Sequence, residues 1–67
     1  MKVIVNEQVR KDYNNTLLST VDLLEGKVYD VVEIKEVGRY YKRYRIVDES
    51  GEDYLYPQGL FIIVKDN

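Results

Sequence analysis

Residues 39–45 bring together side chains that could bind a partner. The segment reads RYYKRYR, so it carries four cations and three tyrosines in seven residues. Guanidinium and ammonium groups can follow a phosphate backbone while bases stack on tyrosine rings. Tyrosine and arginine are also enriched at the centres of protein–protein interfaces. The segment therefore predicts a binding surface, either for another protein or for a nucleic acid.

The sequence gives little support to catalysis or metal binding. The chain has no histidine and no cysteine, so the commonest general base and the strongest nucleophile are missing. Ser19 and Ser50 have no evident activating neighbour. The acidic segment 48–53 lacks the ligand spacing of an EF-hand calcium loop, and we interpret it as a solvated turn. We expect a protein that is not an enzyme and that uses no metal and no cofactor.

Charge is nearly balanced over the chain but unevenly distributed along it. The formal net charge is −2, so no global field draws the chain to nucleic acid or acidic lipid. Four carboxylates within residues 48–53 follow the cationic segment closely and would repel a polyanion. No apolar run is long enough for a membrane span or a signal peptide. Together with the lack of cysteine, these features predict a cytoplasmic protein without membrane contact.

Two strands within residues 26–47, folded back on each other near Gly38, would position the basic segment. Both are rich in β-branched and aromatic residues. A two-residue turn that includes Val37 would place Lys42 opposite Glu33 and would match opposite charges along the hairpin. However, a β-branched residue disfavours the positive φ that such turns require. The alternative is a longer loop with Gly38 in the left-handed conformation and a shifted register.

The rest of the chain predicts short strands and almost no helix. Residues 6–15 show no regular alternation and are interpreted as a loop. Residues 16–25 could form one short helical turn, because Ser19 or Thr20 could cap it and Gly26 follows its end, or they could form an irregular loop. Five strands joined by tight turns predict an all-β fold, a five-stranded small barrel, since closure removes exposed edges. The three remaining strands are expected at residues 3–5, 53–56 and 61–64.

Several short motifs within residues 23–64 resemble the SH3-like barrel. They are Leu24-x-Gly26-x-x-Tyr29-x-Val31, Gly51 and Tyr56-Pro57-x-x-Leu60-Phe61. The resemblance implies that a glycine opens the second strand and that a proline-led 3₁₀ turn leads into the fifth. In members that bind proline-rich peptides, paired tryptophans would fall near Tyr40 and Tyr41, and Pro57 matches the site proline. The chain looks most similar to small stand-alone SH3-like proteins of bacteria and phages, with a single domain over residues 1–67.

The tyrosines divide according to their sequence neighbours. Those that precede or alternate with apolar residues are expected in the core, namely Tyr29, Tyr44 and Tyr56. Those expected at the surface are Tyr13, Tyr40, Tyr41 and Tyr54.

These observations favour a non-catalytic module that binds another protein through a tyrosine and arginine surface near Gly38. The alternative is nucleic-acid binding by the same cationic strand, and a third interpretation is self-association through a free edge strand. The residues expected to contact a protein are Tyr40, Tyr41, Arg43, Tyr54 and Pro57, the last two at a groove edge. The residues expected to contact a nucleic acid are Arg39, Lys42, Arg43 and Arg45.

Overall fold

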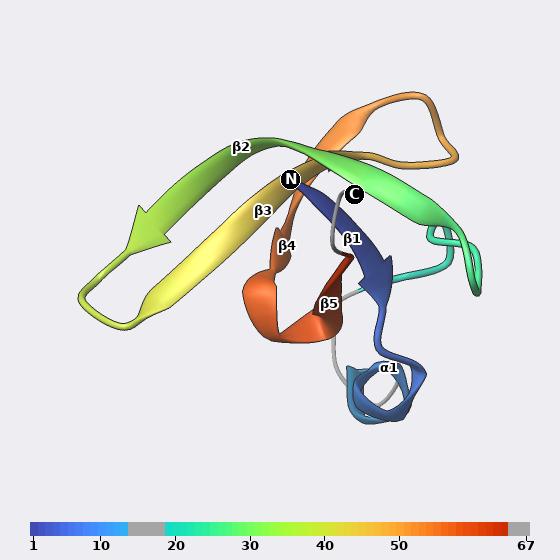
Figure 1. Cartoon of the computed structure of the whole chain (residues 1–67), viewed down its shortest axis with the longest axis horizontal. Coiled ribbons are helices and arrows are strands. Elements are labelled where there is room, and N and C mark those ends of the chain that lie inside the picture. The colour runs from blue at the N-terminus through green and yellow to red at the C-terminus, as the bar shows by residue number, and fades with distance from the viewer. Residues whose placement is uncertain (14–18, 65–67) are drawn as a thin grey trace.

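The structure is a computed structural model that describes residues 1–13 and 19–64, and Figure 1 shows how their elements are arranged. The described residues form five strands, one α-helix and one 3₁₀ helix. In chain order the elements are β1 (Lys2–Val5), α1 (Glu7–Tyr13), β2 (Val28–Val37), β3 (Tyr41–Val47), β4 (Asp53–Pro57), η1 (Gln58–Leu60) and β5 (Phe61–Val64). The prediction of a mostly-β protein with five strands is confirmed.

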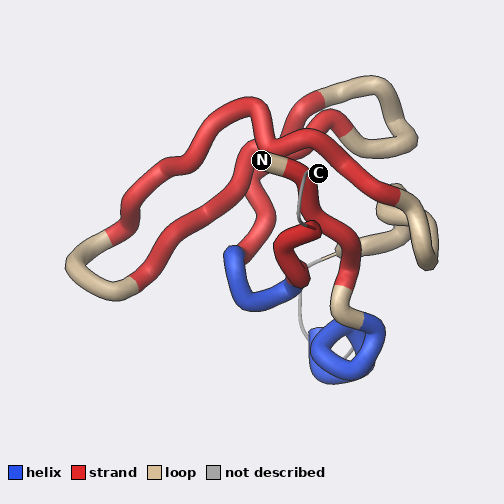
Figure 2. Tube along the Cα trace, viewed as in Figure 1, coloured by secondary structure: helices blue, strands red, loops and turns tan. Residues whose placement is uncertain are grey.

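All five strands belong to one antiparallel sheet with the order β4-β3-β2-β1-β5. The first residues of β2 pair with β1 and the remainder pair with β3, and a register shift between Val31 and Glu33 interrupts β2. Figures 1 and 2 show the β2–β3 hairpin reaching away from the rest of the molecule. β4 and β5 end the strand order and are not paired with each other, so the described sheet is not closed.

The β2–β3 hairpin turns through the three residues 38–40. Lys42 pairs with Glu36, whereas a two-residue turn would have paired it with Glu33. Gly38 has a φ of 69°, which glycine adopts at no steric cost, so the predicted longer loop is confirmed. The two-residue register is wrong because its tight turn would also need a positive φ at a β-branched residue.

Helix α1 lies where the sequence was interpreted as a loop. Asn6 caps it, because its side-chain Oδ1 accepts hydrogen bonds from the backbone N–H groups of Gln8 at 3.1 Å and Val9 at 3.4 Å. Val9 and Tyr13, which are four residues apart on one helix face, pack against the core. A seven-residue helix is too short to be stable alone, so this packing and the cap decide its position.

Of the two alternatives for residues 16–25, a helical turn and an irregular loop, the described part of the segment forms the loop. Residues 16–18 lie outside the described residues, and residues 19–26 form turns and bends without a helix. The backbone N–H of Leu23 donates to the carbonyl of Thr20 at 3.1 Å. Leu23 is fully buried in this turn, so burial of one side chain rather than a periodic helix face organises the segment.

The core consists of apolar and aromatic side chains from every strand, from η1 and from the turn before β2. Tyr29, Tyr44 and Tyr56 are all buried, as their sequence neighbours predicted. Phe61 packs against two of these rings, with centroid distances of 6.1 Å to both Tyr44 and Tyr56. The buried apolar residues are Val3, Val5, Leu23, Tyr29, Tyr44, Ile46, Tyr56, Leu60 and Phe61.

Truncation of Ile46 tests this assignment of the core. Ile46 is 0% exposed and its neighbour Val47, on the opposite face of β3, is 49% exposed. We expect Ile46→Ala to lower the free energy of unfolding by about 2–4 kcal/mol, because it leaves a cavity. The hydrophobic core of a domain this small supplies only roughly 3–5 kcal/mol of stability, so the loss should be a large part of the total. In urea denaturation, Val47→Ala should cost less than about 1 kcal/mol. Equal losses in the two variants would contradict the register of β3.

Candidate functional site

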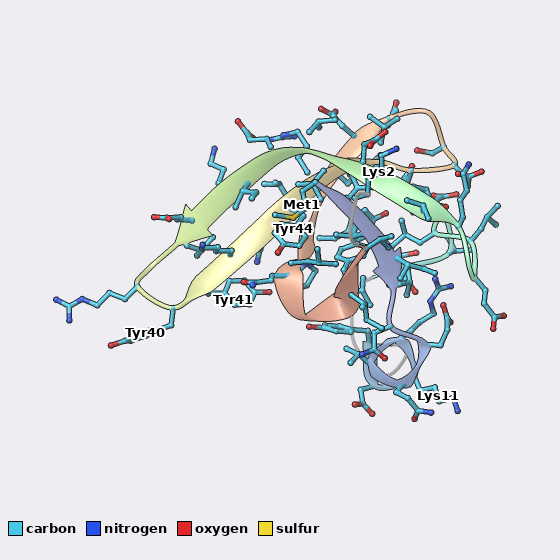
Figure 3. The ribbon with its side chains drawn as sticks, viewed as in Figure 1. Met1, Lys2, Lys11, Tyr40, Tyr41 and Tyr44 are labelled. Carbon is cyan, nitrogen blue, oxygen red and sulfur yellow. The ribbon has the colours of Figure 1, made fainter. Side chains whose placement is uncertain are left out.

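The tip of the β2–β3 hairpin presents two tyrosines and an arginine to solvent. Tyr40 lies in the three-residue turn and is 93% exposed, and Tyr41 opens β3 and is 40% exposed. The guanidinium carbon of Arg43 lies 5.9 Å from the centroid of the Tyr41 ring, which is a cation–π contact. Figure 3 shows Tyr40 and Tyr41 at the end of the hairpin, far from Lys11 on α1. The structure therefore brings together three of the residues predicted for a protein-binding surface.

A shallow groove adjoins this tip and has a volume of about 460 Å³. It runs between β3 and β5, with η1 contributing to its wall. Its floor contains aromatic and aliphatic side chains, of which Ile63 is 56% exposed. The residues that line the groove are Tyr41, Tyr44, Gln58, Gly59, Phe61 and Ile63. The exposed aromatic tip thus continues into a concave apolar surface.

Five groove residues, at positions 44, 58, 59, 61 and 63, were missed by the sequence analysis as site residues, although Tyr44 was expected in the core. A weak signal existed, because Phe61 and Ile63 alternate along the last strand directly after the proline-led turn. That alternation places both side chains on one face of β5. It does not indicate that β3 lies across from them, because this depends on how the sheet folds back on itself.

The four cations of the basic segment are divided into two kinds. Arg45 is neutralised, because its Nε lies 2.9 Å from a Glu33 oxygen and its Nη1 lies 3.6 Å from an Asp53 oxygen. The hydrogen bond and the charge of Arg45 lower the pKa of Glu33. Within residues 1–13 and 19–64, no carboxylate lies within ion-pairing distance of the other three cations, which are Arg39, Lys42 and Arg43. Of the residues predicted to contact nucleic acid, Arg45 is therefore already ion-paired within the fold, and the other three are not ion-paired with the described residues.

Tyr54 does not lie at the hairpin tip, and Pro57 is not presented to solvent. Tyr54 pairs with Ile46, five residues along β3 from Tyr41, which corresponds to roughly 16 Å at the usual strand rise. Its hydroxyl donates to Glu52 at 2.7 Å. Pro57 pairs with Arg43 and is buried, so its ring is not presented at a groove edge.

A second cavity, of about 330 Å³, lies at the acidic β3–β4 turn. The buried carboxylate of Asp48 lines it, and both of its oxygens already accept hydrogen bonds. The Tyr56 hydroxyl donates at 2.6 Å to one oxygen, and Ser50 donates its backbone N–H, at 2.9 Å, and its hydroxyl to the other. Burial alone would raise the pKa of Asp48, but these hydrogen bonds lower it below its ordinary value. Asp48 is therefore a structural anion that organises the turn.

Glu49 connects this turn to the segment before β2. Its carboxylate lies 2.7 Å from the Lys27 ammonium and accepts a hydrogen bond from the Tyr29 hydroxyl at 3.1 Å. The Tyr29 oxygen in turn accepts the backbone N–H of Leu24 at 2.8 Å. The Lys27 hydrogen bond lowers the pKa of Glu49. Thus Asp48 is held by neutral hydrogen-bond donors and Glu49 by an ion pair with Lys27.

Comparisons with known proteins leave the family of the chain open. No family model matches the sequence, and no curated protein or solved structure matches it either. In the part of the chain that the structure describes, no group of three or more acidic, histidine or cysteine side chains could hold a metal ion. No helix among the described residues is long and apolar enough to cross a membrane.

Replacing Tyr56 by phenylalanine tests the structural role of Asp48. The change removes one donor to a buried carboxylate, and we expect it to lower the free energy of unfolding at pH 7 by roughly 1–3 kcal/mol. Tyr54→Phe is the matched control, since the hydroxyl of Tyr54 bonds an exposed carboxylate. That change should cost less than about 0.5 kcal/mol.

The same variants predict a pH dependence with a defined sign. Because the pKa of Asp48 is lowered in the folded chain, its contribution is complete above its ordinary pKa. The contribution is lost as the pH falls from about 4 through the lower, folded pKa. Chemical denaturation between pH 2 and 7 should show a shallower acid decline for Tyr56→Phe than for the native chain. Identical profiles would contradict the role assigned to Asp48.

Proposed function

We propose that this chain is a non-catalytic module on an SH3-like scaffold that binds another protein through the hairpin tip and the adjoining groove. The scaffold is supported by five antiparallel strands in which a 3₁₀ turn after Pro57 leads into the fifth strand. This is the arrangement that the resemblance to SH3-like barrels implies.

One observation carries the proposed function: an exposed aromatic tip is continuous with an apolar groove. Tyr40 is almost fully exposed and contributes little to the core, while Tyr41 belongs both to the tip and to the groove wall. Tyrosine rings lose little conformational entropy on binding and offer both apolar area and a hydroxyl group. Together with Arg43, they provide the side chains that dominate binding energy at protein interfaces.

Nucleic-acid binding is the second candidate, and the three unpaired cations Arg39, Lys42 and Arg43 favour it. Three cations provide few phosphate contacts, because Arg45 is already held by Glu33 and Asp53. Among the described residues, those that line the groove beside them include Phe61 and Ile63 and no cation. Protein binding is therefore the better-supported function.

A capture experiment with matched tyrosine variants tests protein binding. The immobilised chain is exposed to nuclease-treated lysate, and bound proteins are quantified by mass spectrometry. We expect Tyr40→Ala combined with Tyr41→Ala to reduce the bound partner by about tenfold or more, as truncation of interface anchors does. Tyr54→Ala, at the other end of the sheet, should leave capture unchanged. Equal loss with Tyr54→Ala, or no loss with the double variant, would contradict the proposed site.

An amide-shift titration separates the two candidate functions. Short single-stranded and duplex oligonucleotides are added to the labelled chain at two salt concentrations. Phosphate contacts make affinity fall steeply with salt, whereas an aromatic protein interface is only mildly affected. We expect no shifts at residues 39–45 even at low salt. Salt-sensitive shifts there would establish the nucleic-acid alternative instead.

A further inference from the structure

The free edge of β5 faces the groove. β1 pairs with β5 on one side, and the strand order ends at β5. The groove is lined by residues of β3, η1 and β5 and by none of β1. It therefore lies on the side of β5 that no described strand occupies. An unpaired strand edge beside a concave apolar surface is the arrangement used by proteins that bind an extended peptide as an added strand.

The register shows which backbone groups of β5 point to this edge. The N–H of Asn6 donates to the carbonyl of Leu60 at 2.8 Å, so the backbone of Leu60 faces the β1 side. The N–H of Phe61 instead donates to Gln58 within η1. Along an antiparallel strand, successive residues direct their backbone N–H and C=O groups to opposite sides. Ile62 therefore bonds toward β1, and Ile63 directs its N–H and C=O to the free edge. Ile63 is thus the residue on which an added strand would pair.

Natural edge strands are usually protected by a lysine, a proline or a bulge. The sequence of β5, FIIV, contains neither a lysine nor a proline. Ile62 and Ile63 lie on opposite faces of the strand, and each is more than half exposed. Both faces of β5 therefore present exposed apolar surface next to its free edge.

The charge beside the groove helps to distinguish three kinds of occupant for the free edge of β5: a second copy of the chain, an extended peptide segment and a nucleic acid. Arg43 lies against the ring of Tyr41, which lines the groove, and the described part of the chain supplies no carboxylate within ion-pairing distance of Arg43. A second copy joined through β5 would supply the apolar sequence FIIV, which carries no carboxylate. An extended segment with acidic side chains would instead neutralise Arg43. A nucleic acid has no backbone N–H and C=O ladder to pair with Ile63.

We propose, building on the protein-binding function above, that the partner presents an extended segment in which acidic and aliphatic residues alternate, and that this segment adds to the free edge of β5. Its backbone pairs with Ile63, its aliphatic side chains enter the groove over Phe61, and its carboxylates approach Arg43. Tyr41, stacked with Arg43, covers the bound segment at the hairpin side.

Selection from a displayed library of random twelve-residue peptides tests the partner chemistry. The enriched peptides should carry net negative charge and alternating β-branched residues. Arg43→Glu should weaken the best peptide about tenfold or more. Lys11→Glu, an exposed site on α1, is the charge-matched control and should have little effect. Enrichment of basic or proline-rich peptides, or no enrichment, would overturn the proposal.

Backbone methylation of the selected peptide tests the strand pairing itself. In an added strand, alternate N–H groups point toward the sheet and the others toward solvent. N-methylation at one parity should therefore weaken binding about tenfold or more, and at the other parity should change it little. Equal effects at both parities, or no effect, would contradict strand addition.

Ile63→Pro examines the same pairing from the side of the protein. Proline is tolerated on edge strands when the missing N–H faces outward, so the fold should persist. We expect Ile63→Pro to weaken the peptide about tenfold more than Ile63→Ala, which keeps the N–H. If Ile63→Pro still captures the partner in a manner that depends on Tyr41, protein binding stands and strand addition fails. If the chain dimerises through β5 in sedimentation experiments, a second copy is the occupant and the proposal is wrong.

Discussion

The contact of Phe61 with Tyr44 and Tyr56 holds the two ends of the sheet together. Phe61 belongs to β5, at one end of the strand order, while Tyr44 and Tyr56 belong to β3 and β4 at the other. No hydrogen-bonded ladder joins β5 to β4 in the described residues, so side-chain packing brings these ends together. The groove exists because this packing closes the interior but leaves the β5 edge unpaired. Its floor is formed by Tyr44 and Phe61 themselves.

The charged groups divide the molecule into two ends with different roles. At the β3–β4 turn, carboxylates are held by hydroxyl, backbone and ammonium donors, as in the contacts of Asp48 and Glu49. At the hairpin tip, the cations Arg39, Lys42 and Arg43 have no such partner among residues 1–13 and 19–64. Exposed ion pairs contribute little to stability, so leaving these cations unpaired costs the fold little. It leaves them available for a partner of opposite charge.

Local patterns in the sequence predicted most of the strands and the type of hairpin. β-branched runs indicated β1 and β5, Gly38 indicated a left-handed turn residue, and Pro57 indicated a tight turn where η1 lies. The buried tyrosines also followed from their apolar neighbours. These features depend on residues close together in the chain, where steric preference and alternation are informative.

Features that depend on tertiary packing could not be predicted in the same way. Helix α1 is too short for propensity to decide, and its position depends on the Asn6 cap and on the packing of Val9 and Tyr13. Tyr54 appeared to belong with Tyr41 by residue type, but strand pairing places it opposite Ile46. The groove needs three elements to converge, which no local pattern specifies.

Amide hydrogen exchange of β5 in the free chain tests most directly whether this strand keeps an open edge beside the groove. The N–H of Ile62 faces β1 and the N–H of Ile63 faces the groove. We predict slow exchange at Ile62 and fast exchange at Ile63, with exchange at Ile63 becoming slow once a partner binds. Equal protection of both amides in the free monomer would show that the edge is already paired and would contradict the proposed binding site.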